Sequence, residues 1–182
     1  IMQPIIIAMI CSSFSSGFYL SKKRIQTACK NSSYVIEQSK KNEIDPLLFS
    51  SLIYVESGWK KTAISSAGAC GLTQVIPKYT GKITKKYTCE QLKNPRISIA
   101  AGTKILKWWI DYHKKNNALT KKQKLRMGPE KLELYYITRG LCGYNAGFRC
   151  KGLRPNKQGM KYARKILSIQ KKIILKNREN SE

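Results

Sequence analysis

The segment Pro46-Leu-Leu-Phe-Ser-Ser-Leu-Ile-Tyr-Val-Glu-Ser57 decides the fold, because it is apolar nearly all round. Such a segment predicts a helix that lies in the core of a domain and not on its surface. Asp45 is a favourable N-cap, and Pro46 suits the first helical position. Gly58 suits the position at which the helix stops. The sequence therefore predicts a buried helix that starts at Pro46 and ends next to Gly58.

One carboxyl group is carried by this helix toward apolar surroundings. Leu48, Leu52 and Glu56 follow at i, i+4 and i+8, so they share one face of the helix. Burial disfavours the ionised form of a carboxyl group and raises its pKa, which is what a general acid needs at neutral pH. Glu56 is therefore the candidate catalytic residue. The alternative for a glutamate near a helix end is a solvated side chain without a chemical role.

Three further blocks follow Glu56 along the chain. They are Gly68-Ala-Cys-Gly-Leu-Thr-Gln-Val-Ile-Pro77, Asn94-Pro-Arg-Ile-Ser-Ile-Ala-Ala-Gly102 and Gly143-Tyr-Asn-Ala-Gly147. Gly68 and Gly71 predict a tight turn in which the backbone approaches a ligand closely, because glycine has no Cβ. Tyr144 and Asn145 lie between glycines, which predicts a loop with two functional side chains.

With Glu56-Ser57, these blocks resemble the lytic transglycosylase domain of the soluble-transglycosylase family, a relative of goose-type lysozyme. They correspond, in order, to that family's ES, GLMQ…P, dP..NI..G and AYNAG patterns. Thr73 stands where the family usually has Met, and Ser98 stands where it usually has Asn. The resemblance covers roughly residues 42–168. It implies an all-α, lysozyme-like domain with a minor β-hairpin near residues 68–77.

The resemblance also implies a reaction. The family cleaves the bond between N-acetylmuramic acid and N-acetylglucosamine in peptidoglycan without water and leaves 1,6-anhydro ends. Glu56 would act first as general acid and then as general base. Ordinary glycosidases use two carboxyl groups. Of the ten acidic residues of this chain, only Glu56 lies inside a matching block.

A second set of residues is expected to bind the glycan or to position Glu56. The resemblance places Ser57, Ser65, Gly71, Leu72, Gln74, Tyr144, Asn145 and Tyr162 in this set. The amide of Gln74 offers both a donor and an acceptor to a sugar. No cofactor and no metal is expected, because the chain has one histidine, His113, beside two lysines in a predicted helix.

The chain is strongly basic, with 35 Lys and Arg residues against 10 acidic ones and a net charge of +25. Such a charge concerns partners and not the fold. The basic residues are dispersed, and no nucleic-acid-binding motif is present. We therefore expect peptidoglycan as the partner, with association at the membrane surface as a further option. Specific nucleic-acid binding is not expected, and the protein is expected to be a monomer.

Six cysteines allow many pairings. Cys142 and Cys150 flank the Tyr144–Asn145 segment, and Cys70 and Cys89 flank the segment after the Gly71 turn. This placement favours disulfides and an oxidising compartment. The alternative is six thiols in a cytosolic protein.

Three parts are expected along the chain. Residues 1–20 are hydrophobic and predict a signal peptide or weak anchor, with a buried N-terminal helix as the alternative. Residues 21–176 form the transglycosylase domain, with helices near 25–42, 95–115, 131–141 and 159–176 and a basic insertion at 116–130. Residues 177–182 are a polar tail. Export to the periplasm or cell envelope is expected, in a bacterium or as a component of a phage particle.

Two other functions stay open. A muramidase would hydrolyse the same bond, although no second carboxyl group lies in the matching blocks. A protein of another class would use this scaffold only to bind the cell wall or nucleic acid. Glu56, Gln74 and Tyr144 favour an enzyme, because a scaffold that only binds does not need this combination.

Overall fold

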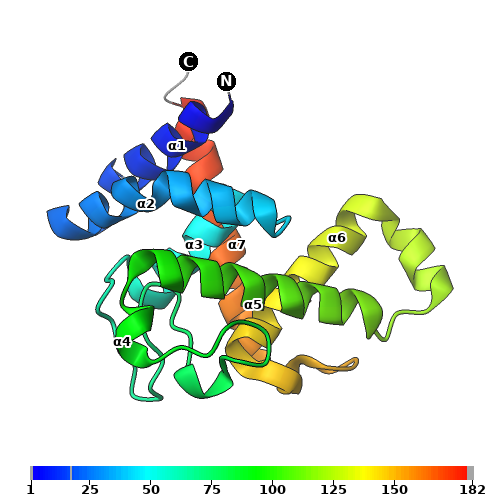
Figure 1. Ribbon diagram of the computed structural model, residues 1–182. Coiled ribbons are helices and arrows are strands. Elements are labelled where there is room, and N and C mark those ends of the chain that lie inside the picture. The colour runs from blue at the N-terminus through cyan, green and yellow to red at the C-terminus, as the bar shows by residue number, and fades with distance from the viewer. Residues whose placement is uncertain (1, 17, 180–182) are drawn as a thin grey trace. The chain divides into compact units, whose positions relative to one another are not determined.

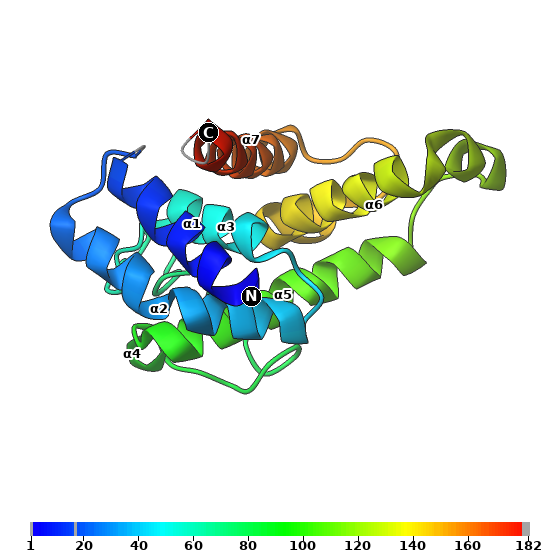
Figure 2. The ribbon, with the colours of Figure 1, turned by 90° about the horizontal axis from the view of Figure 1, so that it is seen from above.

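The structure is a computed structural model that describes residues 2–16 and 18–179 and is mostly helical within them (Figures 1 and 2). The α-helices are α1 (Met2–Ser16), α2 (Lys22–Lys41), α3 (Pro46–Ser57), α4 (Cys89–Leu92), α5 (Pro95–Lys115), α6 (Lys121–Ala146) and α7 (Lys157–Glu179). Two 3-10 helices, η1 (Pro77–Tyr79) and η2 (Gly147–Cys150), complete the described elements. The all-α class is confirmed. In place of the expected β-hairpin there are isolated bridges, Ile64 to Cys70 and Cys70 to Val75.

The helix that carries Glu56 forms as the sequence predicts. The Asp45 carboxylate accepts a hydrogen bond from the backbone N–H of Leu48 at 2.7 Å, and Pro46 opens α3. Gly58 ends it at a φ of 53°, in the left-handed region that glycine adopts without strain. Every residue from Leu47 to Ile53 is buried, so α3 is a core helix.

The chain divides into two compact units. The first consists of Ile1–Lys104 with Ile166–Glu182, and the second consists of Ile105–Lys165. The first unit contains Glu56 and the Gly71 turn. The second unit contains Tyr144 and Asn145.

The N-terminal segment is a helix that packs within the first unit. Ile10 and Phe14 of α1 have 0% exposed surface, and Cys11 forms a disulfide with Cys29 of α2. Figure 1 shows α1 beside α2. Among the described helices, none is both long enough and apolar enough to cross a bilayer.

The helix α6 is longer at both ends than the helix predicted near residues 131–141. Residues expected to form an irregular basic insertion belong largely to α6, which begins at Lys121 behind a capping box of Thr120 and Gln123. Gly128, with a φ of 71°, interrupts the helix next to Pro129. The helical geometry then continues to Ala146, further than predicted.

Candidate active site

Glu56 lies in the last turn of α3, directly after the buried part of the helix. Its side chain is half-buried. Glu56 therefore stands near the end of a core helix and keeps partial access to solvent. This placement suits a group that exchanges protons with a bound ligand.

Ser57 joins the end of α3 to the Gly71 turn. Its hydroxyl donates to the carbonyl oxygen of Leu72 at 2.8 Å and also lies 3.2 Å from the carbonyl oxygen of Ile53. The bond to Leu72 spans fifteen residues of sequence. Ser57 thus fixes the position of the residue next to Glu56 relative to the turn.

The Gly71 turn needs glycine for packing. Gly71 has a φ of 78°, and a Cβ built on it would lie 1.9 Å from the carbonyl oxygen of Leu92. The missing side chain therefore makes room for the backbone at the end of α4. This packing gives a reason for glycine at position 71 besides the predicted close approach to a ligand.

Gln74 closes the same turn from the inside. Its Nε2 donates to the carbonyl oxygens of Ala63 at 3.1 Å and Gly71 at 2.9 Å. Its own backbone is left-handed, with a φ of 49°, which is unusual for a residue other than glycine. The amide nitrogen of Gln74 is engaged in the turn, so the carbonyl oxygen is the atom of this amide suited to a ligand.

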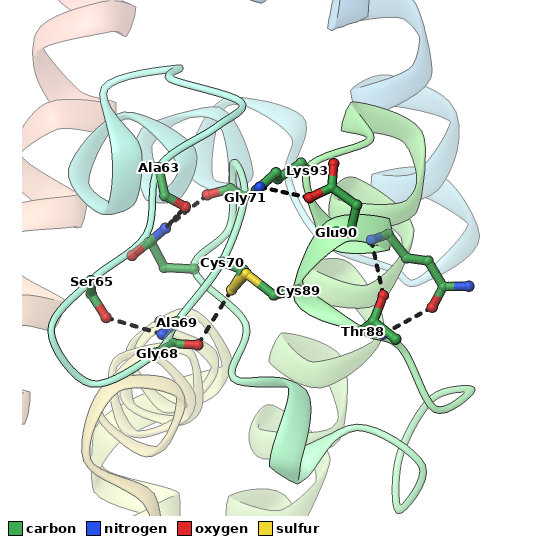
Figure 3. Close-up of a disulfide and its surroundings, with 12 residues drawn as sticks. Ala63, Ser65, Gly68, Ala69, Cys70, Gly71, Thr88, Cys89, Glu90 and Lys93 are labelled. Carbon is green, nitrogen blue, oxygen red and sulfur yellow. Dashed lines mark hydrogen bonds and ion pairs between the residues drawn. A yellow bond between two sulfur atoms is a disulfide. The ribbon is translucent and has the colours of Figure 1, made fainter.

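Two other predicted site residues are also built into the turn. The Ser65 hydroxyl accepts from the backbone N–H of Ala69 at 3.0 Å, as Figure 3 shows. The Leu72 side chain has 0% exposed surface and belongs to the core. The contact of Leu72 with the residue next to Glu56 is made by its backbone carbonyl, which accepts from the Ser57 hydroxyl.

The two departures from the family pattern are in direct contact. The Thr73 backbone N–H donates to the Ser98 hydroxyl at 3.1 Å, and the Thr73 hydroxyl donates to the Ser98 carbonyl oxygen at 2.9 Å. Both side chains have 0% exposed surface. Gly102 gives them space, since a Cβ built there would lie 2.7 Å from the Thr73 Cβ. The sequence alone did not indicate that Thr73 and Ser98 are in contact, because they lie 25 residues apart.

A disulfide holds the turn from its other side. Cys70 is bonded to Cys89, the first residue of α4 (Figure 3). Thr88 caps α4 through a capping box with Gln91. The turn is therefore fixed to α3 by Ser57, to α5 by Ser98 and to α4 by a covalent bond.

In the second unit, the prediction of a loop around Tyr144 and Asn145 is wrong, because both residues lie in the last turn of α6. The glycines on either side are explained by packing and by the end of the helix, and not by a loop. A Cβ on Gly143 would lie 2.5 Å from Cε3 of Trp109, and Gly147 ends the helix with a φ of 62°. Tyr144 is half-buried and Asn145 is exposed. Tyr162 is half-buried on α7 in the same unit.

The segment after Asn145 is held by a disulfide and by an arginine. Cys142 is bonded to Cys150. The guanidinium of Arg139 has 4% exposed surface and donates through Nη2 to the carbonyl oxygens of Cys150 and Gly152. Burial lowers the pKa of Arg139 from its ordinary value. Arg139 and the disulfide together fix the chain that follows the end of α6.

His113 is a packing residue. It has 2% exposed surface and stacks on Trp109 with 6.2 Å between ring centroids. Burial, with the positive charge of Arg139 as a smaller cause, lowers the pKa of His113 to about 4. In the described part of the chain, no three acidic, cysteine or histidine side chains form a group suited to a metal ion.

Several other acidic residues have structural partners. Asp111 pairs with Lys107 at 2.8 Å and Glu133 pairs with Lys114 at 2.9 Å. Glu90 pairs with Lys93 at 2.6 Å. Asp45 caps α3. Each of these four acids therefore has a structural contact.

Residues 33–167 match the family model described as the transglycosylase SLT domain. This chain belongs to the SLT transglycosylase family. The resemblance that the Glu56, Gly71 and Tyr144 blocks carry is thereby confirmed, and it extends over most of the chain. Residues 2–32, which include α1, lie before the matched part.

The fold is similar to that of the lytic transglycosylase Slt from Pseudomonas aeruginosa, known from an X-ray structure of an inactive mutant. The TM-score is 0.60 at 18% sequence identity, and the likeness covers 88% of this chain and 26% of that one. This SLT chain therefore spans about a quarter of the length of that relative. The lysozyme-like SLT fold is confirmed by this likeness.

Proposed function

We propose that this SLT protein is a lytic transglycosylase that cleaves the bond between N-acetylmuramic acid and N-acetylglucosamine in peptidoglycan. The observation that carries the proposal is Glu56 at the exit of a core helix, next to a serine that ties it to the Gly71 turn. In the Slt relative, a glutamate-to-glutamine exchange gives an inactive mutant. Loss of activity on that exchange supports a reaction that depends on a glutamate carboxyl group, the role proposed for Glu56 here.

In this reaction Glu56 donates one proton to the substrate and later accepts one from it. Glu56 donates its proton to the oxygen between the two sugars, and the bond from that oxygen to C1 of the muramic acid breaks. The C6 hydroxyl of the same sugar forms a new bond to C1, and its proton passes to the Glu56 carboxylate. Glu56 ends protonated, and no water is consumed. The product is a 1,6-anhydro end.

The remaining predicted residues would hold Glu56 and the glycan. Ser57 is the positioning residue for Glu56, and Gly71 and Leu72 form the backbone to which it is tied. Ser65 and Gln74 would contact acetamido and hydroxyl groups from the turn. Tyr144, Asn145 and Tyr162 would bind glycan in the second unit, because they match the family pattern.

Products of purified peptidoglycan, separated and weighed by mass spectrometry, test the proposal. We expect muropeptides with anhydro ends, each one water lighter than the reducing form. Reducing ends would show a hydrolytic muramidase instead. Unchanged peptidoglycan that nevertheless binds the protein would show a scaffold that only binds.

We propose that the protein acts outside the cytoplasm, in the periplasm, at the cell envelope or in a virion. Three disulfides in the described chain support an oxidising compartment. The net charge of +25 supports attraction to anionic surfaces of the envelope, including the membrane. On α6, Lys121, Lys122 and Arg126 are exposed beside Leu125, which is 75% exposed and suits contact with a lipid surface.

A further inference from the structure

The helix α1 lies outside the residues that match the SLT family, yet one of its faces is fully covered. Ile10 and Phe14 have 0% exposed surface and Ser13 has 1%. These residues follow at i, i+3 and i+4, so they share one face of the helix. A helix buried in this way is part of the core of its unit.

Phe14 reaches the residues on both sides of Glu56. Its ring stacks on Tyr54, with 5.5 Å between centroids, and meets Trp59 edge-on, with 5.6 Å between centroids. Phe18 adds a further contact to Tyr54 at 4.7 Å. Tyr54 precedes Glu56 by two residues and Trp59 follows it by three. The α1 segment therefore fixes the chain immediately before and after the proposed catalytic carboxyl group.

The turn after Glu56 needs such support. Trp59 has a φ of 62°, in a region that bulky residues rarely adopt, and it persists only where the surroundings hold it. The indole has 0% exposed surface, and its Nε1 is buried without a hydrogen-bond partner. Ring packing, and not a polar contact of this nitrogen, holds Trp59 in place, and Phe14 supplies part of that packing.

Two further links attach α1 to the rest of its unit. The disulfide from Cys11 to Cys29 connects it covalently to α2. Asn177 of α7 donates to the Ser13 hydroxyl at 2.7 Å and accepts from the Ser12 hydroxyl at 3.2 Å. Removal of α1 as a signal peptide would leave Cys29 without its partner and would uncover Tyr54 and Trp59.

We infer that α1 is retained in the mature enzyme and that Phe14 is a positioning residue for Glu56, acting through Tyr54 and Trp59. The inference rests on the proposed role of Glu56. It gives α1, which precedes the residues matched by the SLT family model, a role in positioning Glu56.

The test compares Phe14→Ala and Phe14→Leu with Tyr19→Ala in the full oxidised chain. Tyr19 is an aromatic residue in the segment between α1 and α2 with 106% relative exposure, so its removal is the matched control. Each variant is assayed on soluble glycan strands at a temperature where circular dichroism shows it folded. We expect Phe14→Ala to lower kcat about tenfold or more with KM within about twofold. Phe14→Leu should restore part of the loss, and Tyr19→Ala should behave as wild type.

Hydrogen exchange provides a readout that does not depend on activity. Amides from Glu56 to Lys60 should exchange faster in Phe14→Ala than in Tyr19→Ala. An inactive wild type would refute the proposed function, while the exchange rates would still show whether Phe14 holds this turn. A folded Phe14→Ala with wild-type kcat, or exchange rates equal to the control, would overturn the positioning role. If Phe14→Ala does not fold, Phe14→Leu takes its place under the same criteria.

Retention of α1 is tested on the protein recovered from its native source. Intact-mass and non-reducing peptide analysis should find residues 2–16 present and joined through Cys11 to Cys29. A mature chain that starts after residue 20 would overturn this part of the inference.

Discussion

The hydroxyl of Ser57 donates a hydrogen bond to the carbonyl oxygen of Leu72 across 2.8 Å. Leu72 itself is fully buried and follows Gly71, whose φ of 78° and missing Cβ let the turn fit against Leu92. One end of this bond is therefore fixed by the core. The other end is the residue next to Glu56, so the bond transmits the rigidity of the turn to the proposed catalytic group.

Replacing Ser57 by Ala should impair catalysis more than folding. We expect a stability loss of about 1 kcal/mol, typical of one hydrogen bond. We expect kcat to fall with little change in KM, because Glu56 loses its positioning and not its chemistry. Steady-state kinetics and urea unfolding measure the two effects. Ser51→Ala is the control, since the Ser51 hydroxyl donates to the Leu47 carbonyl oxygen within α3 itself, at 2.7 Å. Equal activity in the two variants would contradict the role of Ser57.

Replacing Glu56 by Gln should leave the fold intact and remove nearly all turnover. Gln keeps the size of the side chain but cannot donate and then recover a proton, so the rate should fall by about 10²–10⁴-fold. Release of anhydro-muropeptides measures the effect. Glu90→Gln, which breaks only a surface ion pair with Lys93, is the control. A Glu56→Gln enzyme with more than about a tenth of the wild-type rate would show that another group is the acid.

Thr73 and Ser98 should be energetically coupled. Removal of the Ser98 hydroxyl leaves the buried Thr73 N–H without this acceptor, at a cost of about 1–3 kcal/mol. The Thr73 and Ser98 hydroxyls lie 2.9 Å apart, so a double-mutant cycle with Thr73→Ala and Ser98→Ala, measured by urea unfolding, should give a coupling of at least about 0.5 kcal/mol. Additive single effects would mean that the two departures from the family pattern are independent.

Much of α3 could be predicted because its signals are local. The cap at Asp45, the proline after it and the glycine at the end define the helix without reference to the rest of the chain. The bounds of α5 were predicted for the same reason, since Asn94 and Pro95 start it. The disulfide from Cys142 to Cys150 is present as expected from the position of the two cysteines on either side of the Tyr144–Asn145 segment.

The parts that were missed depend on distant neighbours. Gly143 looks like a loop residue until the ring of Trp109 is placed against it. The packing need for glycine at position 71 also comes from a distant neighbour, because a Cβ there would meet the Leu92 carbonyl oxygen. For the N-terminal segment the sequence left a signal peptide or weak anchor and a buried helix as alternatives, and the burial of Phe14 and the Cys11 disulfide, which favour the buried helix, could not be read from it. In each case the local sequence is compatible with two structures, and tertiary packing selects between them.

His113 should make the second unit sensitive to acid. Its pKa is about 4 in the folded protein against an ordinary value of 6.5, so the unfolded chain binds the proton more tightly. Stability is therefore unaffected above about pH 6.5, falls as the pH drops toward 4, and has lost up to about 3 kcal/mol there. Urea unfolding at a series of pH values should show a shallower decline in His113→Phe, which keeps a ring against Trp109. Identical pH dependence in wild type and variant would contradict this assignment.

The positive charge should produce DNA binding that is weak, independent of sequence and strongly reduced by salt, because it reflects phosphate neutralisation alone. Binding to glycan strands should keep a part that resists salt, since Gln74, Tyr144 and Asn145 are proposed to contact uncharged sugar groups. Titrations of duplex DNA and of purified glycan at low and high salt measure the difference.

A variant with Lys121, Lys122 and Lys124 changed to Gln is the control. It should bind DNA more weakly, with a smaller salt dependence, and keep the salt-resistant glycan binding, because these residues lie on α6 far along the chain from the Tyr144 block. Tight, sequence-selective DNA binding with no retained glycan affinity would favour a binding protein over the enzyme.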